Sequence, residues 1–303
     1  MKLHQLLPFV VFISVFVSCK KSDSTNTGGS GTGTNPAVAV TLSNVSYGTD
    51  AAQKMDVYLP ANRSAATTKV IVLIHGGAWS QGDKTDLSTL QFGMVITDSL
   101  KTRFPGYAIC NINYRLSTGT ANLFPAQEND VKAAVQYIFD HATDYVISGK
   151  YVFIGESAGA HLCMLQGFKY STPLKPKAIV SLFGPTDLTD MYNNPAGPNP
   201  ALAQLVLAQT IGATPATNAA LYTSSSPVNF VGAGSPPTIL LHGGADPLVN
   251  PSQSVAVQTK LTTAGVPNQY VLYPGKGHGD DWGDAIYKDA FNKIQAFVTA
   301  NVQ

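Results

Sequence analysis

Short apolar runs alternate with amphipathic stretches over most of this chain, and that alternation restricts the folds open to it. Strand-forming runs, several of them next to glycine, are found at 45–47, 55–59, 70–74, 107–112, 151–154, 178–183, 238–242 and 269–273. Helical patterns are found at 87–101, 126–140, 158–168, 252–264 and 284–299. Strands of this kind, alternating with helices, are typical of a mostly parallel sheet covered on both faces. The sequence therefore predicts an α/β fold with eight strands, the first two forming an antiparallel hairpin at the sheet edge.

The segment 185–231 breaks the alternation. It is rich in proline, asparagine and serine, and it contains only a short helical piece near 201–209. It lies between two predicted strands, at the edge where open α/β sheets bind ligands. A long irregular insertion at this place is typical of a cap or binding loop.

The N-terminus has the pattern of a targeting segment. Lys2 precedes an apolar run at 6–17 that is short for a bilayer span and typical of a signal peptide over 1–18. The run ends in VFVSC, which resembles a lipoprotein cleavage box with Cys19 as the lipidated residue. A Ser/Thr/Gly-rich tether then reaches residue 40, and a single domain fills 41–303. We expect an exported, membrane-anchored lipoprotein of a Gram-negative-type envelope, on its periplasmic or cell-surface face; ordinary secretion is the alternative.

Charge and cysteine content narrow the classes of partner. The chain has 19 basic and 18 acidic residues, and loss of Lys2 with the signal peptide leaves the two signs equal. A neutral protein lacks the basic surface that nucleic acids require, so no nucleic-acid partner is expected. Cys110 and Cys163 lie in apolar segments and are predicted to be small buried side chains, although a disulfide between them stays possible. No Cys/His spacing indicates a metal, and no cofactor is expected.

The most informative motif is YVFIGESAG at 151–159. A predicted strand leads into Gly155-Glu156-Ser157-Ala158-Gly159, and a predicted helix follows. This is the nucleophile-elbow pattern, in which a serine sits on a sharp strand-to-helix turn and the glycines leave room for the strained backbone. The turn exposes the hydroxyl and directs the N-terminus of the helix at any anion formed there. Ser157 is therefore the predicted nucleophile.

A second motif, HGGAW at 75–79, follows the third predicted strand. A glycine-rich turn at this position can bring backbone N–H groups against the carbonyl oxygen of a substrate. We predict one oxyanion donor at Gly77, with Gly76 or Ala78 as neighbours, and a second at Ala158. A plain strand-to-helix turn is the simpler alternative.

The loops after the last two predicted strands supply an acid and a base. Asp246 lies in GGADPLV and His278 lies in PGKGHG, and both loops are at the strand edge where Ser157 is expected. A base held by a carboxylate is what a serine nucleophile needs for acyl transfer. Asp187, after the preceding strand, is the rival acid.

These motifs together resemble the α/β-hydrolase superfamily from about residue 45 to the C-terminus. The likeness is to the carboxylesterase type, most of all the bacterial acetyl-xylan/feruloyl esterase-like group, with hormone-sensitive-lipase-like esterases as cousins. The order Ser157, Asp246, His278 is that of α/β-hydrolases. Besides the motifs above, the matching pieces are MDVYLP at 55–60, NYRL at 113–116, FPA at 124–126, DVKAA at 130–134 and Ser226-Pro227.

The resemblance implies a serine carboxylic-ester hydrolase that removes small acyl groups, such as acetyl or feruloyl, from carbohydrates or similar esters. One departure is Ala78, where cousins often have a third glycine; the backbone donor survives, and the added methyl narrows the acyl pocket. Amide cleavage by the same three residues, as in dipeptidyl-peptidase or formamidase relatives, stays open. So does a non-catalytic glycan-binding lipoprotein, although such a module has no need of Asp246 and His278 together. The sequence leaves the oligomeric state open.

Other residues near the motifs are expected to shape or support the site. Trp79 and Tyr114 either wall the substrate pocket or pack in the core. Glu156 is expected to bond loop backbone or Arg115 and so hold the elbow. His75 is expected to brace its loop, and His242 to point inward or brace its own loop. His141 and His161 are expected to be core or surface residues.

Overall fold

A computed structural model describes residues 34–88 and 96–303. The predicted signal peptide and Cys19 lie outside these residues, as does most of the predicted tether. The first residues described already contact the body of the domain, because the Thr34 hydroxyl donates to the Asp144 carbonyl oxygen and the Arg63 guanidinium donates to the Val38 carbonyl oxygen. No helix within the described ranges is long and apolar enough to cross a membrane.

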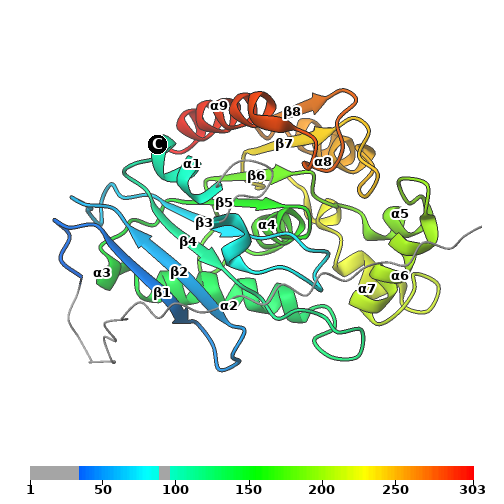
Figure 1. The fold of residues 1–303 in the computed structure, drawn as a ribbon, viewed down its shortest axis with the longest axis horizontal. Coiled ribbons are helices and arrows are strands. Elements are labelled where there is room, and N and C mark those ends of the chain that lie inside the picture. Colours follow the sequence, from blue (N-terminus) through cyan, green and yellow to red (C-terminus); the bar gives the residue numbers. More distant parts are fainter. Residues whose placement is uncertain (1–33, 89–95) are drawn as a thin grey trace, which may run out of the picture. The chain divides into compact units, whose positions relative to one another are not determined.

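One eight-stranded sheet organises the domain (Figure 1). Its spatial order is β1-β2-β4-β3-β5-β6-β7-β8, with β1 and β2 antiparallel to each other and β2 antiparallel to β4. All other neighbours are parallel, so the predicted α/β sheet with an antiparallel edge hairpin is confirmed. The strands are β1 (Val40–Ser46), β2 (Lys54–Leu59), β3 (Val70–Ile74), β4 (Ala108–Ile112), β5 (Tyr151–Glu156), β6 (Ala178–Leu182), β7 (Thr238–Gly243) and β8 (Asn268–Tyr273).

The helices flank the sheet on both sides. The longer ones match the predicted ranges closely, and the prediction for α2 has the observed bounds. Only the helix predicted at 87–101 differs: a short 3-10 helix η1 (Lys84–Ser88) precedes α1 (Ile96–Arg103), and 89–95 lie outside the described residues. The others are α2 (Ala126–Asp140), α3 (Ala142–Tyr145), α4 (Ala158–Lys169), α5 (Leu188–Asn193), α6 (Pro200–Ile211), α7 (Ala219–Ser224), the 3-10 helix η2 (Pro227–Phe230), α8 (Ser252–Thr263) and α9 (Gly283–Asn301).

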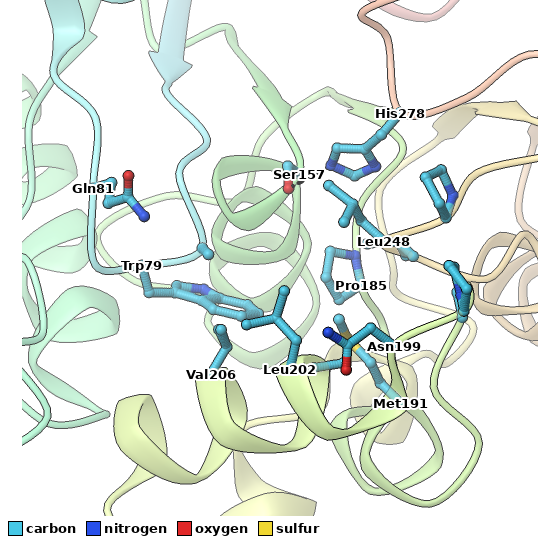
Figure 2. A pocket seen from close by; sticks show the side chains of 16 residues that line it. Trp79, Gln81, Ser157, Pro185, Met191, Asn199, Leu202, Val206, Leu248 and His278 are labelled. Carbon is cyan, nitrogen blue, oxygen red and sulfur yellow. Dashed lines mark hydrogen bonds between the residues drawn. The ribbon is translucent and has the colours of Figure 1, made fainter. Parts of the chain in front are cut away.

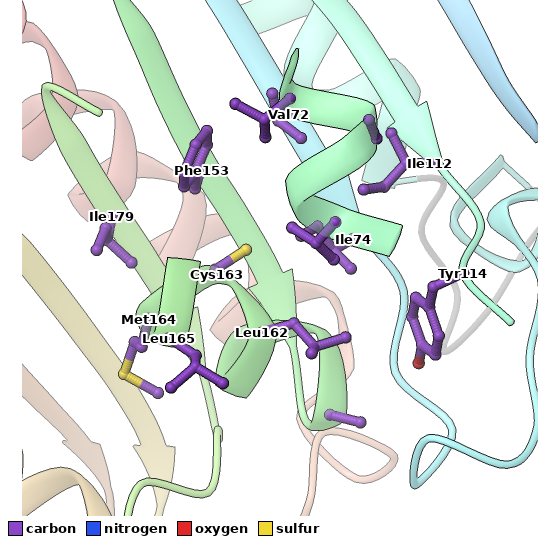
Figure 3. Packing of buried hydrophobic residues seen from close by; sticks show 14 of the residues in the cluster. Val72, Ile74, Ile112, Tyr114, Phe153, Leu162, Cys163, Met164, Leu165 and Ile179 are labelled. Atoms are coloured by element: carbon purple, nitrogen blue, oxygen red, sulfur yellow. The ribbon is translucent and has the colours of Figure 1, made fainter. Parts of the chain in front are cut away.

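Strand alternation creates two cores, one on each face. In β3, Val72 and Ile74 belong to the core under α2, α4 and α8, whereas Ile71 and Leu73 belong to the core under α1 and α9. All five β3 residues are buried, which explains why the strand reads as a continuous apolar run. In Figure 3, side chains of α4 lie among those of the strands, including Leu162, Cys163, Leu165, Ile74, Phe153 and Ile179. Cys163 and Cys110 are both buried free thiols, so no disulfide joins them.

Strand β1 starts earlier than its predicted range. The prediction missed its first half because a bulge interrupts the alternation of its side chains. The register shifts between Leu42 and Val45, and Asn44 there has a φ of 56°. The Asp56 carboxylate accepts a hydrogen bond from the Asn44 amide and so supports the bulge. The polar residues at the bulge break the alternation of apolar and polar positions, so the sequence pattern does not reveal the first half of the strand.

Candidate active site

The elbow between β5 and α4 has the strained geometry that its sequence predicts. Ser157 has φ 49° and ψ −119°, a conformation that residues with a side chain rarely adopt. The flanking glycines are needed because backbones approach closely. A Cβ on Gly159 would lie 2.2 Å from the Ile74 carbonyl oxygen, and one on Gly155 would lie 2.5 Å from the Gly159 backbone. The two glycines let β5, α4 and β3 meet tightly enough to hold Ser157 at the turn.

Three loops at one edge of the sheet bring the predicted nucleophile, base and acid into a hydrogen-bonded row. His278 Nε2 lies 2.8 Å from Ser157 Oγ, and His278 Nδ1 lies 2.6 Å from Asp246 Oδ2. The rival acid, Asp187, instead caps α5 by accepting a hydrogen bond from the Asp190 amide. Of the two candidate carboxylates, the geometry favours Asp246.

Asp246 is buried and fully engaged. Its Oδ1 accepts hydrogen bonds from the Leu248 and Val249 amides, at 2.8 and 2.9 Å. Its Oδ2 is 3.2 Å from His242 Nε2 in addition to its bond with His278. Burial alone would raise the pKa of Asp246, but the bonds from the two histidines and the amide outweigh it and hold the pKa well below its usual range. The carboxylate is therefore charged at neutral pH and fixes His278 Nδ1 as the protonated nitrogen.

His242 is a brace for this carboxylate, consistent with the structural role expected of it. It is completely buried at the end of β7, and the Ser254 hydroxyl lies 2.7 Å from its Nδ1. Its Nε2–H then points toward the Val249 carbonyl oxygen and Asp246. The sequence located this histidine but gave no sign that it shares the carboxylate with His278.

The loop that carries His278 is held from several directions. The Asp281 carboxylate accepts a hydrogen bond from the Gly277 amide, and the Trp282 indole donates to the Gly277 carbonyl oxygen. The ring of Phe183 lies 4.6 Å from the His278 ring. These contacts fix the imidazole between its two partners.

The glycine-rich loop after β3 lies beside the serine. Gly77 has a φ of 100°, and a Cβ there would lie 2.2 Å from the Gln81 carbonyl oxygen, so only glycine fits. Ala78 lines the same pocket as Ser157. Ala158 is the first residue of α4, and its amide is one of those that a helix cannot pair internally. The predicted oxyanion donors are thus grouped around Ser157, with the positive end of the helix among them.

Tyr114 braces this loop and does not line the pocket. Its hydroxyl donates to the Gly76 carbonyl oxygen at 2.9 Å, and its ring stacks on His75 at 4.4 Å. Its predicted substrate-binding role is therefore not supported, because the ring faces the buried side of the loop. His75 has the bracing role expected of it, since its Nδ1 lies 2.8 Å from the same Gly76 oxygen.

Glu156 supports the elbow through the loop backbone. Burial raises the pKa of Glu156 to about 7, against the lowering effects of a hydrogen bond from Gly76 and of His278. Arg115 is not its partner: the guanidinium pairs with Asp130, 2.7 Å away. One of the two contacts expected of Glu156 is thus present and the other is absent.

The pocket above Ser157 is largely apolar, and half of its lining residues come from the 185–231 insertion. It has a volume of about 430 Å³. Figure 2 shows Trp79 and Val206 at its lower side and His278 at the opposite side. The side chains from the insertion were not predicted one by one, and they include Pro185, Met191, Leu202 and Val206. The only advance signal for them was the position of the insertion in the chain.

Trp79 is the predicted pocket aromatic that does line the cavity. It is 2% exposed, and its indole N–H donates to His161 Nδ1 at 3.2 Å. The other ring nitrogen of His161 lies 2.7 Å from the Ser225 carbonyl oxygen. Burial lowers the pKa of His161 to about 4, so the ring is neutral and can accept from Trp79 while it donates to Ser225. His161 therefore ties the loop after β3 to the insertion.

Within the described ranges, no group of three or more His, Cys, Asp or Glu side chains is arranged to hold a metal ion. The polar side chains that line the pocket include Ser157, His278, Gln81 and Asn199. This arrangement can activate a serine hydroxyl beneath an apolar cavity.

The model of the BD-FAE family matches residues 55–261 of this chain, more than half of its length. Esterase LipQ of Mycobacterium tuberculosis is 29% identical over 225 residues, which are 70% of this chain and 50% of that protein. A truncated form of a carbohydrate esterase from gut microbiota has a similar structure, with a TM-score of 0.72 and 26% identity over 88% of this chain and all of that one. A bifunctional GH43-CE protein of Bacteroides eggerthii gives a TM-score of 0.71 and 27% identity, covering 87% of this chain and 38% of that one. The chain spans about half the length of the curated relatives it matches.

Proposed function

This chain belongs to the BD-FAE family of α/β-hydrolases, and on that premise we propose that it is a serine carboxylic-ester hydrolase that works through an acyl-enzyme. The observation that carries the proposal is the continuous row from Ser157 Oγ through His278 to Asp246 beneath an apolar pocket. The esterase names of its relatives support the same reaction class.

In the first half of the reaction, His278 Nε2 takes the proton of Ser157 as Oγ attacks the ester carbonyl carbon. The oxygen becomes negative and receives hydrogen bonds from the Ala158 amide and from the Gly77 or Ala78 amide. Asp246 stabilises the imidazolium that forms. His278 then passes its proton to the leaving alcohol, and the acyl group stays on Ser157.

In the second half, water replaces the alcohol. His278 removes a proton from the water as its oxygen attacks the acyl carbon, and the oxyanion occupies the same donors. Collapse of this intermediate breaks the bond to Ser157 Oγ, which regains its proton from His278. The net reaction converts ester and water into acid and alcohol.

For the substrate, we propose small acyl groups such as acetyl or feruloyl on a carbohydrate or a similar alcohol. Two structural neighbours above 25% identity support this choice, because one is titled a carbohydrate esterase and the other a bifunctional GH43-CE protein. Cleavage of an amide by the same three residues is the alternative, and an aminoacyl anilide distinguishes the two. A purely glycan-binding role leaves the ordered row of Ser157, His278 and Asp246 without a purpose.

The test is hydrolysis of p-nitrophenyl acetate, acetylated xylan and methyl ferulate by the purified protein, with an aminoacyl anilide as the amide control. Ser157→Ala should lower kcat/KM by about 10⁴-fold or more without changing the thermal unfolding midpoint. A phosphonate ester should label Ser157 in the wild type, as seen by mass spectrometry of peptides. Equal rates for wild type and Ser157→Ala would refute the serine mechanism.

We also propose that Cys19 carries a lipid and holds the domain at an envelope membrane. The cleavage-box pattern before this residue supports the proposal. Cells grown with labelled palmitate should yield labelled protein that partitions with membranes. Cys19→Ala should remove the label and release the protein to the soluble fraction, and a wild type without label would refute the anchor.

A further inference from the structure

We infer that the acyl and alcohol parts of the substrate occupy opposite sides of the pocket, and that Val206 on α6 sets how far the acyl group can extend. This inference rests on the proposed esterase function and deepens it. It starts from the placement of the pocket side chains around Ser157 and His278.

The chemistry determines which part of the ester lies on which side. His278 Nε2 must give its proton to the alcohol oxygen as the bond to the acyl carbon breaks, so this oxygen has to lie within hydrogen-bond reach of His278. The alcohol then leaves along the side where Leu248 lines the pocket near His278 (Figure 2). The acyl chain extends from the same carbon in the other direction, toward Trp79 and α6.

Figure 2 shows that this acyl side is walled by Trp79, Leu202 and Val206. The indole of Trp79 is buried and bonded to His161, so it has little freedom to move aside. Leu202 is 51% exposed, so it borders the open mouth of the pocket. Val206 is half-buried one helical turn further along α6, toward the interior of the protein.

Val206 also lines a second, smaller cavity of about 140 Å³. The other lining residues of this cavity are polar or small and include Ser80, Ser117, Thr118, Gln209 and Thr210. Val206 is the residue that the two cavities share. An acyl chain that runs along Trp79 therefore meets the Val206 side chain before it reaches the polar cavity.

Hydrogen bonds fix the surroundings of Val206, so this part of α6 should not move away from a long acyl chain. The Phe124 amide donates to the Thr210 carbonyl oxygen at 2.8 Å, and the Ser117 hydroxyl donates to the Gln209 carbonyl oxygen at 3.3 Å. The Ser117 amide in turn donates to the Trp79 carbonyl oxygen at 2.9 Å. These bonds hold the C-terminal half of α6 against the loop that carries Trp79, and the size of the residue at 206 then decides the depth of the acyl site.

The experiment compares Val206→Ala with Leu205→Ala on p-nitrophenyl esters from acetate to decanoate, which vary the acyl chain and keep the leaving group. Leu205 is the matched control because it precedes Val206 on α6, is 52% exposed and is not among the residues that line the pocket. Val206→Ala should raise the ratio of kcat/KM for octanoate over butyrate about tenfold, and Leu205→Ala should leave it unchanged. Val206→Phe should lower the ratio, which provides a second measurement should the alanine variant fold poorly.

A variant on the opposite side of the pocket tests the assignment of sides. Leu248→Ala should change the preference among butyrate esters of methyl, benzyl and p-nitrophenyl alcohols and leave the acyl-chain ratio as in wild type. An unchanged acyl-chain ratio in both active Val206 variants overturns the inference while the esterase function stands. A wild type that hydrolyses none of these esters refutes the proposed function itself.

Discussion

The loops that carry Ser157, His278 and Asp246 differ from the 185–231 insertion in the kind of contact that holds them. In the loops, polar atoms are paired and backbones touch: Asp246 alone accepts from two amides and lies within hydrogen-bond reach of two histidines. In the insertion, the pocket wall consists mostly of apolar side chains, and Leu202 and Leu205 on α6 are about half exposed. Directional hydrogen bonds hold the loops, whereas non-directional packing of apolar side chains holds the pocket wall.

This difference separates two kinds of constraint on substitution. A hydrogen-bonded row tolerates no change of donor or acceptor, because a buried polar group without its partner is costly. An apolar wall tolerates changes of size, because contact there has no direction. Variants of the hydrogen-bonded residues should therefore affect every substrate alike, and variants of the apolar wall should change which substrate is preferred.

Among variants that keep the serine nucleophile, the largest effect is expected for Asp246→Asn. The amide keeps the size of the side chain but no longer stabilises the imidazolium or fixes the tautomer of His278, so kcat should fall about 10⁴-fold for all esters. The measurement is kcat on p-nitrophenyl acetate and butyrate at pH 7.5. The fall in kcat should be equal for both esters, because the acyl chain does not extend to this end of the site.

Asp187→Asn is the matched control for that variant. Asparagine caps a helix as well as aspartate does, so α5 should keep its N-terminal bond and the rate should stay within about twofold of wild type. A large loss in Asp187→Asn with little loss in Asp246→Asn would reverse the assignment of the acid.

Gly159→Ala should have the next largest effect, on stability. The new Cβ would lie 2.2 Å from the Ile74 carbonyl oxygen and 2.5 Å from that of His75, and neither backbone can retreat. We expect a loss of about 3 kcal/mol or more in the free energy of unfolding, measured by urea denaturation. Gly149→Ala is the control, because no atom lies within 4 Å of its added Cβ. A Gly159→Ala protein as stable as Gly149→Ala would show that the elbow is looser than its contacts indicate.

The loops that carry Ser157, Asp246 and His278 can be located from the sequence because a local motif marks each of them. Each strand end carries its own glycine-rich turn, and the order of Ser157, Asp246 and His278 assigns each to a different turn at one edge of a parallel sheet. The bounds of α2 were predictable for the same reason, since Pro125 and the apolar period mark them within a single stretch. Pairings over long distances were harder, as Arg115 shows: it bonds Asp130 and not Glu156.

The pocket wall could not be predicted residue by residue. Helix α6 is apolar around most of its circumference, yet Leu207 and Ile211 are buried while Leu202 and Leu205 are exposed. A pattern without a polar face does not say which side packs inward. Trp79 and Tyr114 were both predicted to line the pocket or to pack in the core, and the sequence did not distinguish them because both are buried aromatic residues.

A smaller effect, limited to one pH range, is expected for Glu156→Gln. Burial raises the pKa of Glu156 from 4.5 to about 7, so the unfolded chain ionises first as the pH rises. The contribution of Glu156 to stability is then complete below about pH 4.5 and is lost as the pH rises through 7. Glutamine does not ionise, so its stability is not lost in this range. Relative to wild type, the free energy of unfolding of the variant should rise by roughly 3 kcal/mol between pH 4.5 and 7.

Urea denaturation of both proteins at half-unit pH steps measures this gain. Asp246 acts in a different range, because its lowered pKa makes its contribution complete above about pH 4 and lost at lower pH. A difference between wild type and Glu156→Gln that stays constant from pH 4.5 to 7 would mean that the carboxyl is already ionised in the folded protein.

The smallest effect is expected for Leu202→Ala in the insertion. Leu202 lines the pocket and is 51% exposed, so its loss should cost little stability and about 1 kcal/mol of contact with an acyl chain long enough to reach it. The kcat/KM for hexanoate should fall roughly fivefold through a higher KM, and that for acetate should not change. Leu205→Ala, equally exposed but outside the pocket, should leave both values as in wild type. An equal fall for acetate and hexanoate would mean that the insertion positions the reacting groups as well as the acyl chain, and the division between the two regions would then fail.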